Sequence, residues 1–138
     1  MYPEELVIPM KEELTENGFK EMLTAAEVDN TLTQKGTALV MINSVCGCSA
    51  GTARPGVLMA IHNTAKKPDQ IATSFAGFDT EAVNQVRKYL MPYPPSSPAI
   101  ALFKDGQLVH MIERHMIEGR SAQMIADNLI GAFDNYCN

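Results

Sequence analysis

The chain has 138 residues, a formal net charge of −5, 46% hydrophobic residues and 20% charged residues. This length fits one domain that should bury roughly 65–70% of its unfolded surface, so folding needs no disulfide framework. The acidic balance, without a basic cluster, argues against a nucleic-acid partner, and no stretch reaches the roughly 18 apolar residues of a membrane span.

The first 36 residues are predicted to be a helical lead-in. Over residues 3–16, acidic residues come early and apolar residues follow at helical spacing, until Asn17-Gly18 ends the pattern. A second helical segment is predicted over residues 19–34 from its apolar spacing, and Gly36 ends it.

A short apolar run over residues 38–42 has no polar alternation, which is typical of a central strand buried on both faces. Cys46-Gly47-Cys48 follows at once, and a helical pattern then continues to about Asn63. Pro55 is expected to start or kink this helix. The sequence therefore places the two cysteines at a strand-to-helix turn.

The rest of the chain predicts three more strands and two more helices. Their expected ranges are 70–76, 99–103 and 108–112 for the strands, and 80–90 and 121–136 for the helices. Asp105-Gly106 separates the last two strands and favours a two-residue type I′ hairpin.

This order of elements predicts an α/β protein with a thioredoxin-like fold. Two strands joined through a helix are expected to be parallel, whereas the hairpin adds an antiparallel pair. We expect a single domain with a four-stranded mixed sheet flanked by helices, in which residues 1–36 form an N-terminal helical extension and residues 37–138 the core. The cysteine turn would lie at the carboxyl end of the first strand, where open α/β sheets place their sites.

Cysteine usage points to a reducing compartment. The three cysteines are Cys46, Cys48 and Cys137, an odd and low count that is not typical of a secreted disulfide framework. The first residues have no basic segment followed by an apolar run, so we expect no secretory signal and a cytoplasmic location. Closely spaced cysteines in such a protein are expected to be redox-active or metal-binding.

The Cys-Gly-Cys spacing favours thiol–disulfide exchange. A thiolate is the attacking species, and a helix N-terminus would lower the pKa of Cys46, with Cys48 less exposed in the turn. Gly47 would permit the unusual backbone torsion of the small ring that joins cysteines two apart. Paired thiolates also hold zinc or copper, but no Cys or His pair with metal spacing supplies further ligands. A thiol metal-binding protein remains the outside alternative.

Three separated motifs stand out along the chain: residues 44–51 with Ala53-Arg54-Pro55, residues 94–98, and residues 109–110 with 114–115 and 117–119. In this order they resemble the bacilliredoxins, a thioredoxin-like family of Gram-positive and related bacteria. Residues 7–10 and a cysteine near the C-terminus add to this resemblance, which covers essentially the whole chain.

The resemblance implies an enzyme that removes bacillithiol from S-bacillithiolated proteins. Cys46 would attack the mixed disulfide and Cys48 would resolve it, with bacillithiol as thiol co-substrate and no bound cofactor. A general protein disulfide isomerase or reductase is the alternative within the enzyme class. We expect a monomer or weak homodimer, with no metal, nucleic-acid or membrane partner.

Two further positions are candidates for supporting roles. Ser97-Pro98 matches the position of the thioredoxin fold's cis-proline, so we expect a cis bond that presents the backbone of Ser97 to the cysteine turn. Pro92 is expected to be an ordinary loop proline. Arg54 is expected either to hold thiolate charge or a bacillithiol carboxylate, or to face solvent on its helix.

The remaining chemically active side chains are expected to be passive. His110, Arg114, His115 and Glu118 are predicted to pack locally at the end of a surface strand, with a functional role as the alternative. Cys137 is predicted on a frayed last turn as a passive thiol, with an extra resolving or dimer-linking role as the alternative.

Overall fold

Five strands form one mixed sheet in the computed structural model, which describes all 138 residues. The order across the sheet is β1-β3-β2-β4-β5. The strands are β1 (Lys20–Glu21), β2 (Thr37–Asn43), β3 (Gln70–Phe75), β4 (Ala99–Lys104) and β5 (Gln107–Ile112). β2 pairs in parallel with β3 and antiparallel with β4, so the predicted mixture of strand directions is confirmed.

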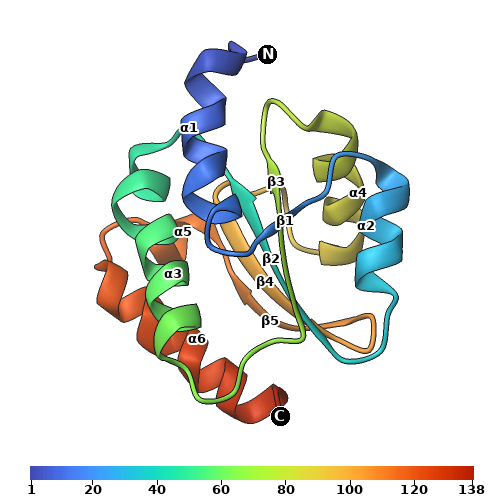
Figure 1. Cartoon of the computed structure of the whole chain (residues 1–138), viewed down its shortest axis with the longest axis vertical. Coiled ribbons are helices and arrows are strands. Elements are labelled where there is room, and N and C mark those ends of the chain that lie inside the picture. The colour runs from blue at the N-terminus through green and yellow to red at the C-terminus, as the bar shows by residue number, and fades with distance from the viewer.

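Helices cover both faces of the sheet (Figure 1). The short α5 (Arg114–Ile117) follows β5. One face carries α1 (Glu4–Thr15), the π-helical segment η1 (Ser49–Ala53), α3 (Arg54–Asn63) and α6 (Ala122–Tyr136). The other face carries α2 (Ala25–Leu32) and α4 (Thr80–Leu90).

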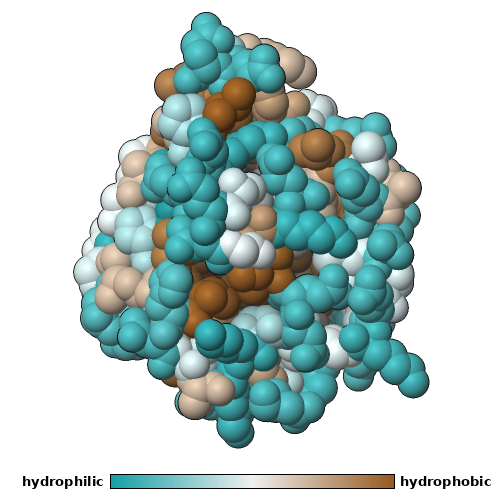
Figure 2. All heavy atoms as spheres, in the orientation of Figure 1, coloured by the Kyte–Doolittle hydropathy of each residue, from teal (hydrophilic) through white to brown (hydrophobic).

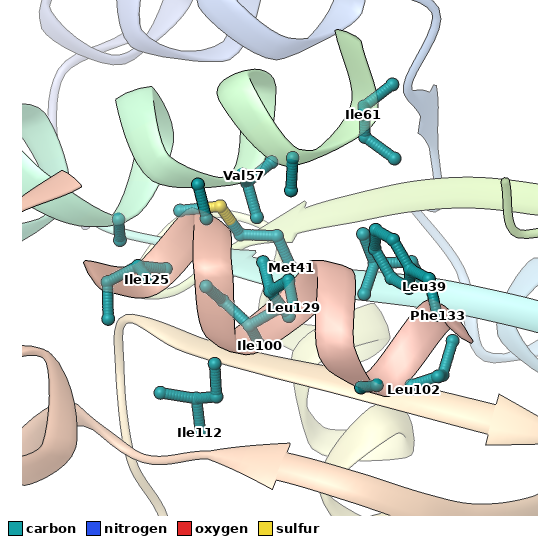
Figure 3. Close-up of a cluster of buried hydrophobic side chains, with 14 of the residues drawn as sticks. Leu39, Met41, Val57, Ile61, Ile100, Leu102, Ile112, Ile125, Leu129 and Phe133 are labelled. Carbon is teal, nitrogen blue, oxygen red and sulfur yellow. The ribbon is translucent and has the colours of Figure 1, made fainter. Parts of the chain in front are cut away.

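β2 is buried along its whole length, as its unbroken apolar run predicts. Its alternate residues serve the two helical layers: Leu39 and Met41 pack with α3 and α6, whereas Val40 and Ile42 pack with α2 and α4. Figure 3 shows Leu39 and Met41 beside side chains of α6, Phe133 among them. Each such burial contributes about 1.5–3 kcal/mol, so the strand that leads into the cysteine turn is held firmly from both sides.

The surface seen in Figure 2 is mostly hydrophilic, with a hydrophobic patch near its centre, between α3 and β3, and smaller ones towards the top of the view. None of the helices combines the length and the apolar character needed to cross a membrane.

The helix predicted over residues 19–34 is wrong at its start. Lys20–Glu21 form β1, which pairs in parallel with β3 at the sheet edge, and α2 begins only at Ala25. A capping box begins that helix: the Thr24 hydroxyl accepts from the N–H of Glu27, and the Glu27 carboxylate accepts from the N–H of Thr24, both at 3.1 Å. The sheet therefore has five strands rather than four.

The predicted hairpin between β4 and β5 is confirmed. Asp105 and Gly106 have φ angles of 51° and 81°, and a type I′ turn requires positive φ at both central residues. The Asp105 carboxylate also accepts a 2.7 Å hydrogen bond from the N–H of Gly36, which ties this turn to the residue before β2.

Candidate active site

The cysteine turn lies where the sequence predicts it, beyond the carboxyl end of β2. The strand ends at Asn43, and η1 begins at Ser49 with Cys48 as its N-cap. The helix then continues as α3, which begins at Arg54 with Pro55 in its first turn, where the missing N–H of proline is tolerated. The turn is thus fixed between a buried strand and a helix start, and π-helical segments like η1 are frequent at functional sites.

Both active-site thiols are reduced and partly exposed. The Sγ atoms of Cys46 and Cys48 are 2.7 Å apart, and the N–H of Cys48 donates to Cys46 Sγ at 3.4 Å. The carbonyl of Cys46 accepts from the N–H groups of Ser49 and Ala50, which begins the helical segment. The Cys46 sulfur therefore sits at the N-terminal end of a helix with hydrogen-bond donors directed at it.

The environment separates the pKa values of the two thiols. Burial disfavours the Cys46 thiolate, but hydrogen bonds from the Cys48 thiol and from backbone N–H groups, with the charge of Arg114, outweigh it and lower the pKa of Cys46. Burial and the hydrogen bond to Cys46 raise the pKa of Cys48 to about 11. When the pair loses its first proton, the negative charge therefore lies on Cys46.

Arg114, at the start of α5, supplies the nearby positive charge. Its guanidinium donates to the carbonyl of Ser97 at 3.4 Å, and its backbone N–H donates to the Ser96 hydroxyl at 2.8 Å. An exposed ion pair joins it to Glu118 at 3.4 Å. The predicted local contacts of Arg114 are present, but the residue lies on a short helix rather than at a strand end. Its charge contributes to the lowered pKa of Cys46, which favours the functional alternative.

The peptide bond between Ser97 and Pro98 is cis, as expected, and Ser97 lines the same cavity as Cys46. The bond between Met91 and Pro92 is also cis, so the expectation of an ordinary loop proline there is wrong. An X-Pro bond has only a small intrinsic preference for trans, so the tertiary surroundings decide the isomer and the local sequence does not.

Arg54 fits neither of its two predicted roles, because only 2% of it is exposed and the charge acting on the reactive thiol is that of Arg114. Its Nη1 donates to Asn43 Oδ1 at 2.9 Å, to the carbonyl of Ser44 at 3.0 Å and to Ser49 Oγ at 3.1 Å. Its Nε lies 3.1 Å from a Glu13 carboxylate oxygen, an ion pair without hydrogen-bond alignment. Arg54 therefore joins the end of β2 to η1 beneath the cysteine turn.

Gly47 is exposed in the dithiol form. A Cβ added there would meet no atom within 4 Å, and its φ lies outside the left-handed region. The reduced turn therefore does not require glycine. The expectation that Gly47 eases closure of the disulfide ring concerns the oxidised form and stays a prediction.

Cys137 is buried as the C-cap of α6, not on a frayed turn. Its thiol lies near Thr37 at the first residue of β2, and burial raises its pKa. Cys46 lies beyond the other end of that strand, whose length is roughly 20 Å. The alternative roles of Cys137 as an extra resolving or dimer-linking cysteine are therefore wrong for the folded chain.

His110 and His115 make local contacts. His110 on β5 has its Nε2 2.7 Å from Asn128 Oδ1 of α6, and exposed His115 is 3.9 Å from Glu113. No group of three or more His, Cys, Asp or Glu side chains is arranged to hold a metal ion.

Comparison with known proteins identifies the family. The family described as "Disulphide isomerase" matches residues 2–137. A bacilliredoxin from Cytophaga hutchinsonii is 58% identical over 134 residues, covering 97% of this chain and 98% of that protein. The chain belongs to the bacilliredoxin family. A bacilliredoxin from Salinibacter ruber is 51% identical over 138 residues, covering 99% of this chain and 81% of its own.

Solved structures confirm the thioredoxin-like fold of this bacilliredoxin. A mutant thioredoxin from Halobacterium salinarum matches with a TM-score of 0.61 and 16% identity, covering 88% of this chain and 93% of that chain. Oxidised thioredoxin from Plasmodium falciparum matches with a TM-score of 0.59 and 17% identity, covering 84% and 98%. A bacilliredoxin with this fold is a thiol–disulfide oxidoreductase.

Proposed function

We propose that this bacilliredoxin removes bacillithiol from mixed disulfides on cytoplasmic proteins, with Cys46 attacking and Cys48 resolving. The difference between the two thiols carries the proposal: the pKa of Cys46 is lowered, whereas that of Cys48 is raised to about 11. The more acidic thiol, Cys46, supplies the attacking thiolate, and Cys48 stays protonated until it attacks the mixed disulfide on Cys46. The family relationship supports bacillithiol as the co-substrate.

In the first step, the Cys46 thiolate attacks the bacillithiol sulfur of the mixed disulfide. The S–S bond of the substrate breaks, a bond forms between Cys46 and bacillithiol, and the substrate protein leaves as a thiolate that takes up a proton. In the second step, Cys48 loses its proton and attacks Cys46 Sγ, which releases bacillithiol and leaves a Cys46–Cys48 disulfide. Reduction of that disulfide requires two electrons, which two external thiols supply as they are joined in a disulfide of their own.

A second molecule of bacillithiol offers another exit from the mixed disulfide on Cys46. A disulfide between cysteines two apart is expected to be strained, which slows attack by Cys48. The external thiolate would then attack the bacillithiol sulfur, release Cys46 as a thiolate and leave as bacillithiol disulfide. Ser97, which lines the cavity beside Cys46, would pair its backbone with the substrate during these steps.

The test traps the first step. We expect Cys48→Ala protein, mixed with a bacillithiolated protein, to acquire one bacillithiol on Cys46 and release the substrate thiol, as measured by peptide mass. Cys46→Ala is the matched control and should acquire none. Failure of the transfer, together with efficient reduction of a protein disulfide by the unmodified chain, would replace the proposal with the disulfide reductase alternative.

General disulfide isomerase activity remains the second candidate, because the matching family is described as "Disulphide isomerase". This candidate needs reactivation of a scrambled disulfide protein in the absence of bacillithiol. The same preparation used for the trapping test can be assayed for it directly.

A further inference from the structure

Two arginines line the cavity beside Cys46, and only one of them, Arg114, lowers the pKa of that thiol. The cavity has a volume of about 340 Å³, and its lining includes Cys46, Ser97 and two guanidinium groups, Arg87 from α4 and Arg114 from α5. No acidic residue lines it. Small-molecule sites have volumes of roughly 300–1,000 Å³, so the cavity suits a small ligand rather than a single ion.

Arg87 has no anionic partner in the protein. It is half-buried, its Nε is shielded from solvent without a hydrogen-bond partner, and no carboxylate forms an ion pair with it. Its neighbours on α4, Val83, Val86 and Leu90, pack in the core and fix the helix that carries it. Partial burial of a guanidinium without an anionic partner costs free energy, so an anion bound in the cavity would give Arg87 the partner that the protein does not provide.

Arg114 can turn to a ligand more cheaply. Its ion pair with Glu118 joins two side chains that are 47% and 56% exposed, and such pairs contribute little because water and salt screen them. The same guanidinium reaches the carbonyl of Ser97, a residue that lines the cavity together with Cys46. Two cationic groups thus reach the cavity from two different elements.

We propose that this cavity binds the acidic part of the small thiol, with one carboxylate on Arg87 and another on Arg114, while the thiol sulfur is joined to Cys46. The inference rests on the proposed function and names its substrate class: mixed disulfides of small thiols that bear two carboxylates. Bacillithiol bears carboxylates and belongs to that class. Arg87 and Arg114 thus take the carboxylate-binding role predicted for Arg54, which lies buried beneath the cysteine turn.

The test measures preference between two small thiols. In a Cys48→Ala background, one carrier protein is modified with either mercaptosuccinate, which has two carboxylates, or uncharged mercaptoethanol. The readout is the second-order rate constant for transfer of mercaptosuccinate to Cys46, divided by that for transfer of mercaptoethanol. We expect Arg87→Gln to lower this ratio by roughly tenfold, the effect of losing a charge-assisted hydrogen bond.

Lys88→Gln is the matched control, because it removes the same charge from the next residue of α4 at an exposed position outside the cavity. Lys88→Gln should leave the ratio unchanged. In the Cys48→Ala protein that keeps Arg87, about 1 M salt should lower the ratio, because charges are then screened beyond roughly 3 Å. An unchanged ratio in Arg87→Gln, or equal slowing of both probes, would overturn the proposal. Thermal unfolding of each variant separates these results from misfolding.

The proposed function and the cavity can fail separately. If the bacillithiolated protein is not a substrate while the mercaptosuccinate preference persists and depends on Arg87, the cavity selects acidic thiols but the physiological thiol is another one. If bacillithiol is transferred without dependence on Arg87, the proposed function holds and the cavity assignment is wrong. Arg114 is unsuitable for this comparison because its charge also acts on the pKa of Cys46.

Discussion

At the scale of single residues, the two thiols of the cysteine turn lose their protons in different pH ranges. Because the pKa of Cys46 is lowered, its thiolate fraction at neutral pH exceeds that of an ordinary thiol. We expect the rate of Cys46 alkylation by iodoacetamide to rise with pH, with its midpoint below pH 9.0. Cys48, with a pKa of about 11, should react only at higher pH. Peptide mass analysis across a pH series measures both.

The charge of Arg114 contributes to this separation, so Arg114→Gln should move the alkylation midpoint of Cys46 to higher pH. Arg120→Gln removes an equal charge at an exposed residue outside the cavity and serves as the control. The same midpoint in both variants would contradict the assignment of Arg114 to the site.

Removal of the buried Arg54 side chain should cost stability. Arg54→Gln would remove the guanidinium donor from the Ser44 carbonyl and from Ser49 Oγ, whereas Asn43 Oδ1 would keep the Ser44 N–H and the Ser49 hydroxyl as donors. We expect the free energy of unfolding to fall by about 2–4 kcal/mol. Urea unfolding measures the change, with Arg120→Gln as a surface control that should change it by less than about 0.5 kcal/mol. A fall of less than about 0.5 kcal/mol in Arg54→Gln would show that the cysteine turn keeps its conformation without the Arg54 hydrogen bonds.

The residues of the site differ in how far the sequence could predict them. The positions of the cysteines and of Pro98 were predictable, because their neighbours along the chain define them. The cysteines lie between a strand and a helix, and Pro98 comes directly before a strand. Arg54, Arg87 and Arg114 owe their surroundings to contacts with distant elements, and an arginine on a helix looks the same in sequence whether it is buried or exposed.

At the scale of elements, the helix that carries the cysteine turn is held by close packing of α3 on α6. A Cβ added to Gly56 would lie 2.8 Å from Ile125 Cβ and 3.0 Å from the carbonyl of Ala122. We therefore expect Gly56→Ala to lower the free energy of unfolding by about 1–3 kcal/mol, the usual cost of overpacking.

Gly131→Ala provides the opposite expectation within α6. Nothing lies within 4 Å of a Cβ there, and alanine should stabilise the helix by roughly 0.5–1 kcal/mol. Denaturant unfolding of the two variants side by side measures the difference. Equal effects would mean that helix propensity, rather than the contact with Ile125, governs Gly56.

The elements with a strong hydrophobic pattern, unbroken in β2 and helical in α6, were predictable, and the shortest ones were not. β2 and α6 fit their expected ranges closely because burial imposes a pattern over many residues. β1 has only two residues, and its identity as a strand depends on pairing with β3 rather than on its own composition.

At the scale of the whole molecule, β2 separates the three cysteines into two groups. Cys46 and Cys48 follow its carboxyl end, whereas Cys137 lies near its start. We expect Cys137→Ala to leave thiol transfer to Cys46 unchanged, and native Cys137 to resist alkylation until the chain unfolds. Timed alkylation in buffer and in denaturant measures this, and rapid labelling of Cys137 in buffer would contradict the burial.

The two ends of the chain also lie at opposite ends of the molecule (Figure 1). Tyr2 lines the cavity beside Cys46, and its ring covers Gly77 so closely that a Cβ there would lie 2.6 Å from it. An affinity tag fused before Met1 would therefore emerge next to the reactive thiol and compete with substrate for access. A tag placed after Asn138 would leave from the far side, which makes that end the better choice for immobilising the enzyme or attaching a redox-sensing fluorescent protein.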